Sequence, residues 1–168
     1  MPVLRRRLLP AQRARLELRP GDRVLAALTL ADGTEAVATR RALHVLSGDA
    51  TARSPWSDVE HGSLDAETRV LTVTWVWGTT SRLEFPDDRS AYAFTQTFKE
   101  RVQQSVVHAR PVSLPGGGRA SVAVRRDEDG ELFVQVMGAT ETDLQDPAAA
   151  LALDAAERQV RETVGLPA

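Results

Sequence analysis

The chain has 168 residues, of which 42% are hydrophobic, so it is long enough to bury a core as one domain or as one domain with a small appendage. It contains no cysteine, which excludes disulfides, thiolate metal sites and cysteine nucleophiles within this sequence. The formal net charge of -2 gives no overall basic character of the kind that nucleic-acid-binding domains carry. No stretch approaches the roughly 18 to 20 apolar residues of a spanning helix, and we expect a cytoplasmic protein.

Residues 1–20 form a basic arm. Residues 1–23 carry seven arginines but only two acidic residues, Glu17 and Asp22. Pro10 suits the first position of a helix, so one short helix is expected between residues 11 and 18, ended by Pro20-Gly21. The basic start is followed by only two leucines and not by a hydrophobic region, so no signal peptide is expected.

Residues 22–85 have the pattern of short strands joined by brief turns. Strands are expected over residues 24–30, 34–39, 42–47, 56–60, 69–77 and 81–85, the fourth being irregular and preceded by a polar loop over residues 48–54. Ala31-Asp32-Gly33 is typical of a tight turn. Six strands in this order predict an antiparallel meander that curls into an open barrel and buries one face.

The apolar spacing changes after Pro86. Phe94, Phe98 and Val102 recur every four residues, which predicts an amphipathic helix from residue 88 to about residue 107. Asp87 or Asp88 supplies the N-cap. The narrow, bulky stripe predicts that this helix closes the open corner of the barrel.

The order of these elements resembles the bacterial PH-like family, which shares the pleckstrin-homology superfold. The resemblance covers about residues 21–107, within a domain expected over residues 21–110, and is carried by the segments 38–46 (ATRRALHVL) and 55–59 (PWSDV), followed by the closing helix. The chain as a whole is also similar in outline to actinobacterial proteins. The resemblance implies an α+β fold with a six-stranded PH-like barrel that is capped by a helix.

The C-terminal part, residues 119–168, is expected to be a ββα extension that packs on the barrel. The proline- and glycine-rich segment 110–118 indicates a flexible joint. Strands at residues 121–126 and 131–138 predict a hairpin around the turn 127–130. A last helix is expected from Asp146, with Pro147 at its first position, to Gly165.

No set of residues has the pattern of a catalytic or metal site. The three histidines are far apart in the sequence, and no serine lies in a G-x-S-x-G turn. Gly116-Gly117-Gly118 precedes a strand and lacks the lysine of a phosphate loop, so it is interpreted as a linker. The turn 127–130 is acidic but lacks the other ligands of a calcium loop. We therefore expect no enzyme, no metal and no cofactor.

The resemblance implies a lipid site that this chain does not keep. Eukaryotic relatives of the fold hold inositol phosphates with basic residues on the first two strands and in the loop between them. Here that loop carries Asp32 and Glu35 and no basic residue. Arg40 and Arg41, at the next turn, are the basic pair that remains in the early strands, and we expect them on the surface.

The composition of the basic arm supports two interpretations. Arg5, Arg6, Arg7 and Arg13 are expected to pair with the acidic body of the chain or with a partner. They also suit an anionic membrane surface, where each contributes about 1 kcal/mol. No aromatic residue lies among them to stack on bases, so no nucleic acid is expected.

Trp75 and Trp77 belong to the richest apolar cluster of the chain. Trp75 is expected in the core, whereas Trp77, at the end of its strand, is either a core residue or an exposed anchor for a partner. The sequence therefore predicts a non-enzymatic module that binds a protein partner or self-associates. A peripheral membrane adaptor that uses the basic arm is the alternative.

Overall fold

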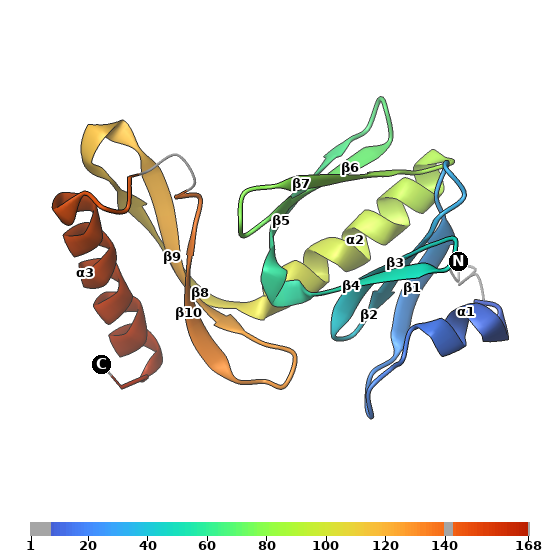
Figure 1. The fold of residues 1–168 in the computed structure, drawn as a ribbon, viewed down its shortest axis with the longest axis horizontal. Coiled ribbons are helices and arrows are strands. Elements are labelled where there is room, and N and C mark those ends of the chain that lie inside the picture. The colour runs from blue at the N-terminus through green and yellow to red at the C-terminus, as the bar shows by residue number, and fades with distance from the viewer. Residues whose placement is uncertain (1–7, 140–142, 168) are drawn as a thin grey trace.

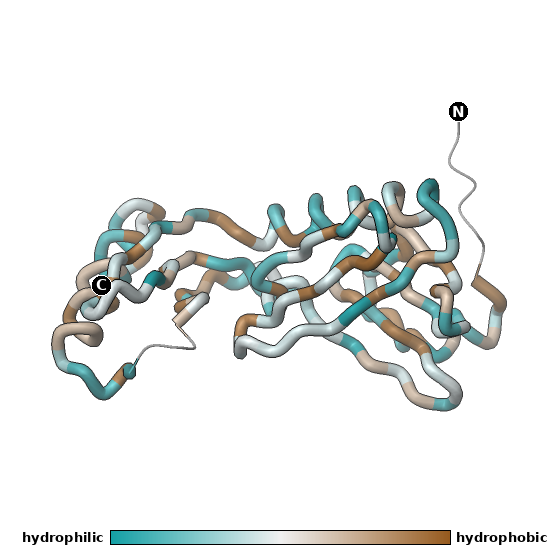
Figure 2. The backbone as a smooth tube through the Cα atoms, turned by 90° about the horizontal axis from the view of Figure 1, so that it is seen from above, coloured by the Kyte–Doolittle hydropathy of each residue, from teal (hydrophilic) through white to brown (hydrophobic). Residues whose placement is uncertain are grey.

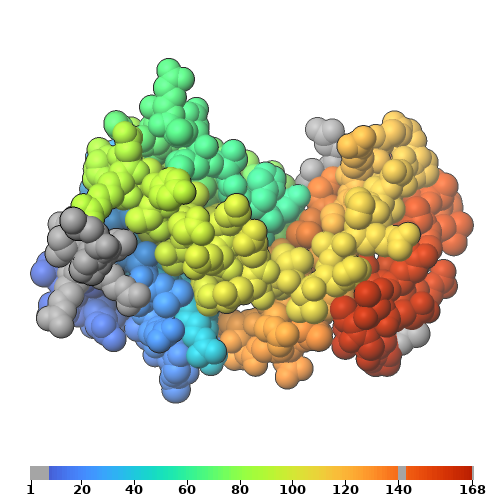
Figure 3. All heavy atoms as spheres, turned by 180° about the vertical axis from the view of Figure 1, so that it is seen from behind, coloured from blue at the N-terminus to red at the C-terminus, as the bar shows by residue number. Residues whose placement is uncertain are grey.

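The computed structural model describes residues 8–139 and 143–167, and in them it has an α+β fold with ten strands in three antiparallel sheets. Two lobes follow one another along the longest axis (Figure 1). The first lobe holds two sheets and the long helix α2 (Asp88–Ser105), and the second holds one sheet and helix α3 (Pro147–Val164). The surface is hollowed between the two lobes (Figure 3).

The first sheet has four strands in sequence order, β1 (Val24–Thr29), β2 (Glu35–Thr39), β3 (Ala42–Ser47) and β4 (Ala50–Pro55). Strand β4 corrects the prediction of a polar loop over residues 48–54. It pairs with β3 from Ser47 opposite Ala50 to Ala42 opposite Pro55. Because most of its side chains are polar or small and exposed, β4 lacks the apolar alternation that marks a strand in a sequence.

The second sheet has three strands, β5 (Val59–Asp65), β6 (Val70–Trp75) and β7 (Thr80–Glu84). A 3₁₀ turn, η1 (Trp56–Asp58), occupies the start of the strand that was expected at residues 56–60. Seven strands therefore precede α2, where six were predicted, and neither sheet in the described chain closes on itself. The prediction of six strands is therefore wrong, and a barrel is not confirmed.

Helix α2 packs across the inner faces of both sheets and begins where it was predicted. The side chain of Asp87 accepts a hydrogen bond from the backbone N–H of Ser90 at 2.7 Å, which caps the helix. Phe94 and Phe98 are 1% and 2% exposed and form the core with Trp56 and Phe85, so the prediction that they face inward is confirmed. Viewed from above, α2 lies along one side of the first lobe with hydrophilic outward turns (Figure 2).

The second lobe is βββα, because a strand follows α2 directly. Strand β8 (Val106–Ser113) pairs with β9 (Arg119–Arg126), and β9 pairs with β10 (Leu132–Met137). The expected joint at residues 110–118 is thus the end of β8 and a 3₁₀ turn, η2 (Pro115–Gly117). Helix α3 is capped by Asp146 and ends at Gly165, which has the left-handed φ of 75° that glycine tolerates best.

The arm folds back on the first lobe. Helix α1 (Pro10–Arg15) is followed by Leu16, which is 1% exposed and packs against Val37 and Leu46 on the outer face of the first sheet. The sheet is thus covered on both faces, by α2 on one and by the arm on the other. No helix of the described residues is long and apolar enough to cross a membrane.

Candidate functional site

The residues that were predicted to form an interaction surface are not gathered in one place. Arg5, Arg6 and Arg7 lie outside the described residues. Arg13 is exposed on α1, and Trp77 lies in the turn after β6, not within the strand. Among the predicted residues that the structure describes, only Arg40 and Arg41, in the turn between β2 and β3, lie beside other charged groups from distant parts of the chain.

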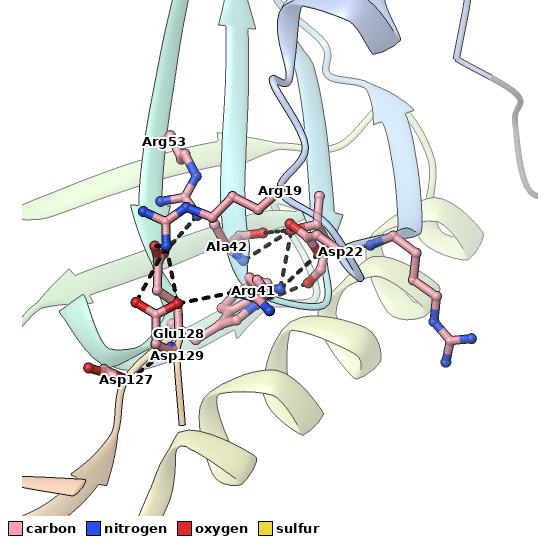
Figure 4. Close-up of polar contacts among 11 residues, drawn as sticks. Arg19, Asp22, Arg41, Ala42, Arg53, Asp127, Glu128 and Asp129 are labelled. Carbon is pink, nitrogen blue, oxygen red and sulfur yellow. Dashed lines mark hydrogen bonds and ion pairs between the residues drawn. The ribbon is translucent and has the colours of Figure 1, made fainter. Parts of the chain in front are cut away.

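The turn between β9 and β10 brings acidic side chains to the first lobe. Glu128 forms ion pairs with Arg19 of the arm and with Arg53 of β4, the latter at 2.7 Å. Asp129 forms ion pairs with Arg19 and Arg41, both at 3.3 Å (Figure 4). The side chain of Glu128 is only 12% exposed, so its pairs are better shielded from solvent than a typical surface ion pair.

The described part of the arm contacts the rest of the chain through two arginines that were not among the predicted residues. Arg19 pairs with the acidic turn, and Arg15 donates to the carbonyl oxygen of Ala50 at 2.7 Å. The turn itself was predicted as a hairpin turn. Its first residue, Asp127, accepts hydrogen bonds from the backbone N–H groups of Asp129 and Glu131, both at 2.9 Å.

Arg125 is buried where the two lobes meet and was not identified from the sequence. Its side chain is 0% exposed. Its Nη2 lies 2.9 Å from the carbonyl oxygens of Trp56 and Val59 and 2.7 Å from Ser105 Oγ. Burial lowers its pKa, and the negative charges of Asp58 and Glu60 oppose that change. Arg125 therefore links β9 to three segments of the first lobe.

A cavity of about 320 Å³ lies beside this junction. Four arginines line it, from the turn between β2 and β3, from α2 and from β9: Arg40, Arg41, Arg101 and Arg126. The rest of its wall includes Trp56 and the polar side chains of Ser57, Gln104 and Ser105, together with the acidic turn. The volume is within the range of small-molecule sites.

A second concave site lies between β1 and the N-terminal half of α2. It has a volume of about 560 Å³ and a mainly apolar wall, formed by residues 25–28 of β1 and by one face of α2 that includes Tyr92, Ala93, Phe94 and Thr97. The side chain of Tyr92 is 73% exposed. We call this site the β1–α2 groove. Nothing in the sequence pattern marked it, because its two walls are 60 residues apart.

Trp75, at the end of the central strand β6, and Trp77, in the turn that follows, form an aromatic pair. Their rings stack with centroids 5.5 Å apart and an interplanar angle of 4°. Trp75 is half-buried against the core, as predicted, whereas Trp77 is 55% exposed. Trp77 is therefore a surface residue.

The chain was compared with family models, with curated proteins and with solved structures, and none of them matches it. Within residues 8–139 and 143–167, no three histidine, cysteine or acidic side chains are placed to hold a metal ion.

Proposed function

We propose that this chain is a non-catalytic interaction module that binds an extended, apolar segment of a partner protein in the β1–α2 groove. The observation that carries the proposal is the edge position of β1 beside an apolar groove. Among the strands of the described residues only β2 pairs with β1, and residues 25–28 of β1 line the groove.

The backbone of β1 offers hydrogen bonds on the side of the groove. The N–H of Leu30 donates to the carbonyl oxygen of Thr34, so the pairs Leu28–Ala36 and Ala26–Ala38 are the hydrogen-bonded ones of this antiparallel ladder. Ala27, between them, directs its N–H and C=O away from β2. An added strand satisfies such groups, which is how many domains recognise extended peptides.

The side chains of β1 do not protect the edge. Natural edge strands commonly carry charged residues or proline, which prevent pairing with other chains. Residues 24–28 read VLAAL and contain neither. An unprotected, half-buried edge of this kind suits a partner that is meant to pair with it.

The shape and charge of the groove favour a single segment over a folded sheet. A helix forms its other wall, so we expect a single extended segment to bind between β1 and α2. Arg89 is its charged lining residue, is exposed, and has no ion pair with the described residues. We therefore expect an apolar segment that carries an acidic residue near Arg89.

The scaffold proposed for this module is PH-like. Support comes from the order of a four-stranded and a three-stranded antiparallel sheet, followed by one helix whose Phe94 and Phe98 fill the space between them. The residues of the resembling segments lie in β2, β3 and η1, at the centre of this arrangement.

Selection from a displayed library of random peptides tests the proposal. The selected peptide is titrated into labelled protein, and backbone amide shifts are followed by NMR. We expect the largest shifts in β1 and the first half of α2. The variant Tyr92→Ala should weaken binding about tenfold, because truncating a central aromatic contact of an interface commonly has an effect of this size.

Trp77→Ala is the matched control, since it removes another exposed aromatic side chain far from the groove, and it should leave the affinity unchanged. Shifts confined to the surroundings of Trp77 would contradict the proposal, as would a concentration-dependent dimer with no peptide binding. Binding only to anionic vesicles, lost when residues 1–9 are removed, would favour the membrane role of the arm instead.

A further inference from the structure

We propose that the cavity between the two lobes binds a phosphate group that is carried by a small ligand. This site is separate from the β1–α2 groove: it lies at the C-terminal end of α2 and is lined by arginines from three different elements. We call it the arginine cavity.

The charges of the arginine cavity do not cancel locally. The acidic residues of its wall are already engaged: Glu128 pairs with Arg19 and Arg53, Asp129 pairs with Arg19 and Arg41, and Asp127 accepts the N–H groups of its own turn. Two of their partners, Arg19 and Arg53, are not among the arginines of the wall. The acidic charges are thus neutralised in part from outside the cavity.

Three arginines of the wall are left without an acidic partner. Arg40, Arg101 and Arg126 form no ion pair with the described residues, and the Nε of Arg101 is buried without an acceptor. A donor that lacks an acceptor is unfavourable, so a ligand that brings acceptor atoms to these arginines is favoured.

The chemistry of these groups selects a phosphate over a carboxylate. Guanidinium groups donate pairs of hydrogen bonds in a fixed plane, and a phosphate presents several oxygens to donors that come from different directions. A doubly charged phosphate also matches three unpaired cations better than a carboxylate with one charge. Trp56 and the hydroxyl groups of Ser57 and Ser105 leave room for the rest of a small ligand.

In the first arm of the test, sodium pyrophosphate is titrated into the full chain by calorimetry at constant ionic strength. In the second arm, the full chain is mixed with phosphatidylcholine vesicles, either with or without a phosphatidylinositol phosphate. We expect saturable binding in one arm, which identifies the source of the phosphate as soluble or lipid. Arg101→Gln should weaken that binding about tenfold, a change of ~1.4 kcal/mol in binding free energy.

Arg40→Gln is a second test variant, because its side chain is exposed and its loss should not disturb the fold. Lys99→Gln is the matched control on the same helix, because Lys99 is exposed and lines neither site, and it should bind like the wild type. The proposal is overturned if neither arm shows saturable binding. It is also overturned if Lys99→Gln weakens binding as much as Arg40→Gln and Arg101→Gln, because net charge alone would then explain the effect.

Discussion

The two ends of helix α2 border sites of opposite character. Near its N-terminus, Tyr92, Phe94 and Thr97 face β1 across an apolar groove. Near its C-terminus, Arg101, Gln104 and Ser105 face arginines and a buried charge across a polar cavity. One helix therefore serves two surfaces that differ in chemistry.

The difference follows from what each end of α2 meets. The first half of the helix lies against β1, the edge strand of the first sheet, where there is no second lobe to cover it. The last turn lies where β9 and the turn after it approach, and they bring Arg125, Glu128 and Asp129. The second lobe thus makes the polar site, whereas the first lobe alone makes the apolar one.

The largest expected effect is at the middle of α2, between the two sites, where the helix packs on the core. Phe98 is 2% exposed, and its ring lies edge-on to that of Trp56 with centroids 5.7 Å apart. Phe98→Ala should lower the free energy of unfolding by about 3 to 5 kcal/mol, because it leaves a cavity in the core. Urea denaturation measures this loss.

The exposed Tyr92 on the same helix supplies the control, since Tyr92→Ala should change stability by no more than about 0.5 kcal/mol. If Phe98→Ala proved as mild as Tyr92→Ala, the two sites would not share one packed core, and the comparison between the ends of α2 would lose its basis.

The second-largest loss of stability is expected at the C-terminal end of α2, beside the arginine cavity. Arg125→Met keeps an unbranched side chain but removes every donor to Trp56, Val59 and Ser105. Because these buried acceptors lose their partner, the free energy of unfolding should fall by about 2 to 3 kcal/mol. Amide shifts should then change around the arginine cavity, while peptide binding at the β1–α2 groove persists.

The neighbouring Arg126 is exposed, so Arg126→Met should be close to neutral in denaturation. Equal losses of unfolding free energy in the two variants would mean that the burial of Arg125 does not increase its contribution to stability. A loss of peptide binding in Arg125→Met would show that the two ends of α2 are not independent.

The smallest effect concerns the outer face of the first sheet, beneath the arm. His44 of β3 is 1% exposed, and neither ring nitrogen has a hydrogen-bond partner in the described chain. Burial, and then the positive charge of Arg53, lower its pKa below the ordinary value of 6.5, while Asp22 and Glu128 oppose this change. The other charged groups around the adjacent cavity are Arg15, Glu17, Arg19 and Asp49.

Because the pKa of His44 is lowered by folding, the unfolded chain binds the proton more readily. The contribution of His44 to stability is therefore complete above about pH 6.5 and is lost as the pH falls toward the pKa of the folded state. The free energy of unfolding should fall as the pH is lowered from about 7.5 to about 5.5. His44→Leu should reduce the slope of this dependence by less than about 1.4 kcal/mol per pH unit, which is the limit for one titrating group.

His61 is exposed on β5 and serves as the control, so His61→Gln should keep the slope of the wild type. If the free energy of unfolding changed with pH in the same way in the wild type and in His44→Leu, a group other than His44 would cause the pH dependence. Burial of His44 beneath the arm would then not make the stability depend on pH.

Local signals in the sequence determined much of the secondary structure. The spacing of Phe94 and Phe98 and the cap at Asp87 located α2, and Asp146 with Gly165 located α3. These predictions succeed because periodicity and capping depend on residues within a few turns of one another. Strand β4 was missed for the converse reason, since pairing with β3 makes it a strand and its own side chains do not.

Only the tertiary structure decided where the two sites lie. Arg125 stands in a strand segment, SVAVRR, in which an arginine is ordinarily assigned to solvent, and it is buried because the first lobe covers that face of β9. The β1–α2 groove and the arginine cavity likewise join walls that are distant in the chain. Such contacts depend on how the elements pack, which the period and composition of a single segment do not encode.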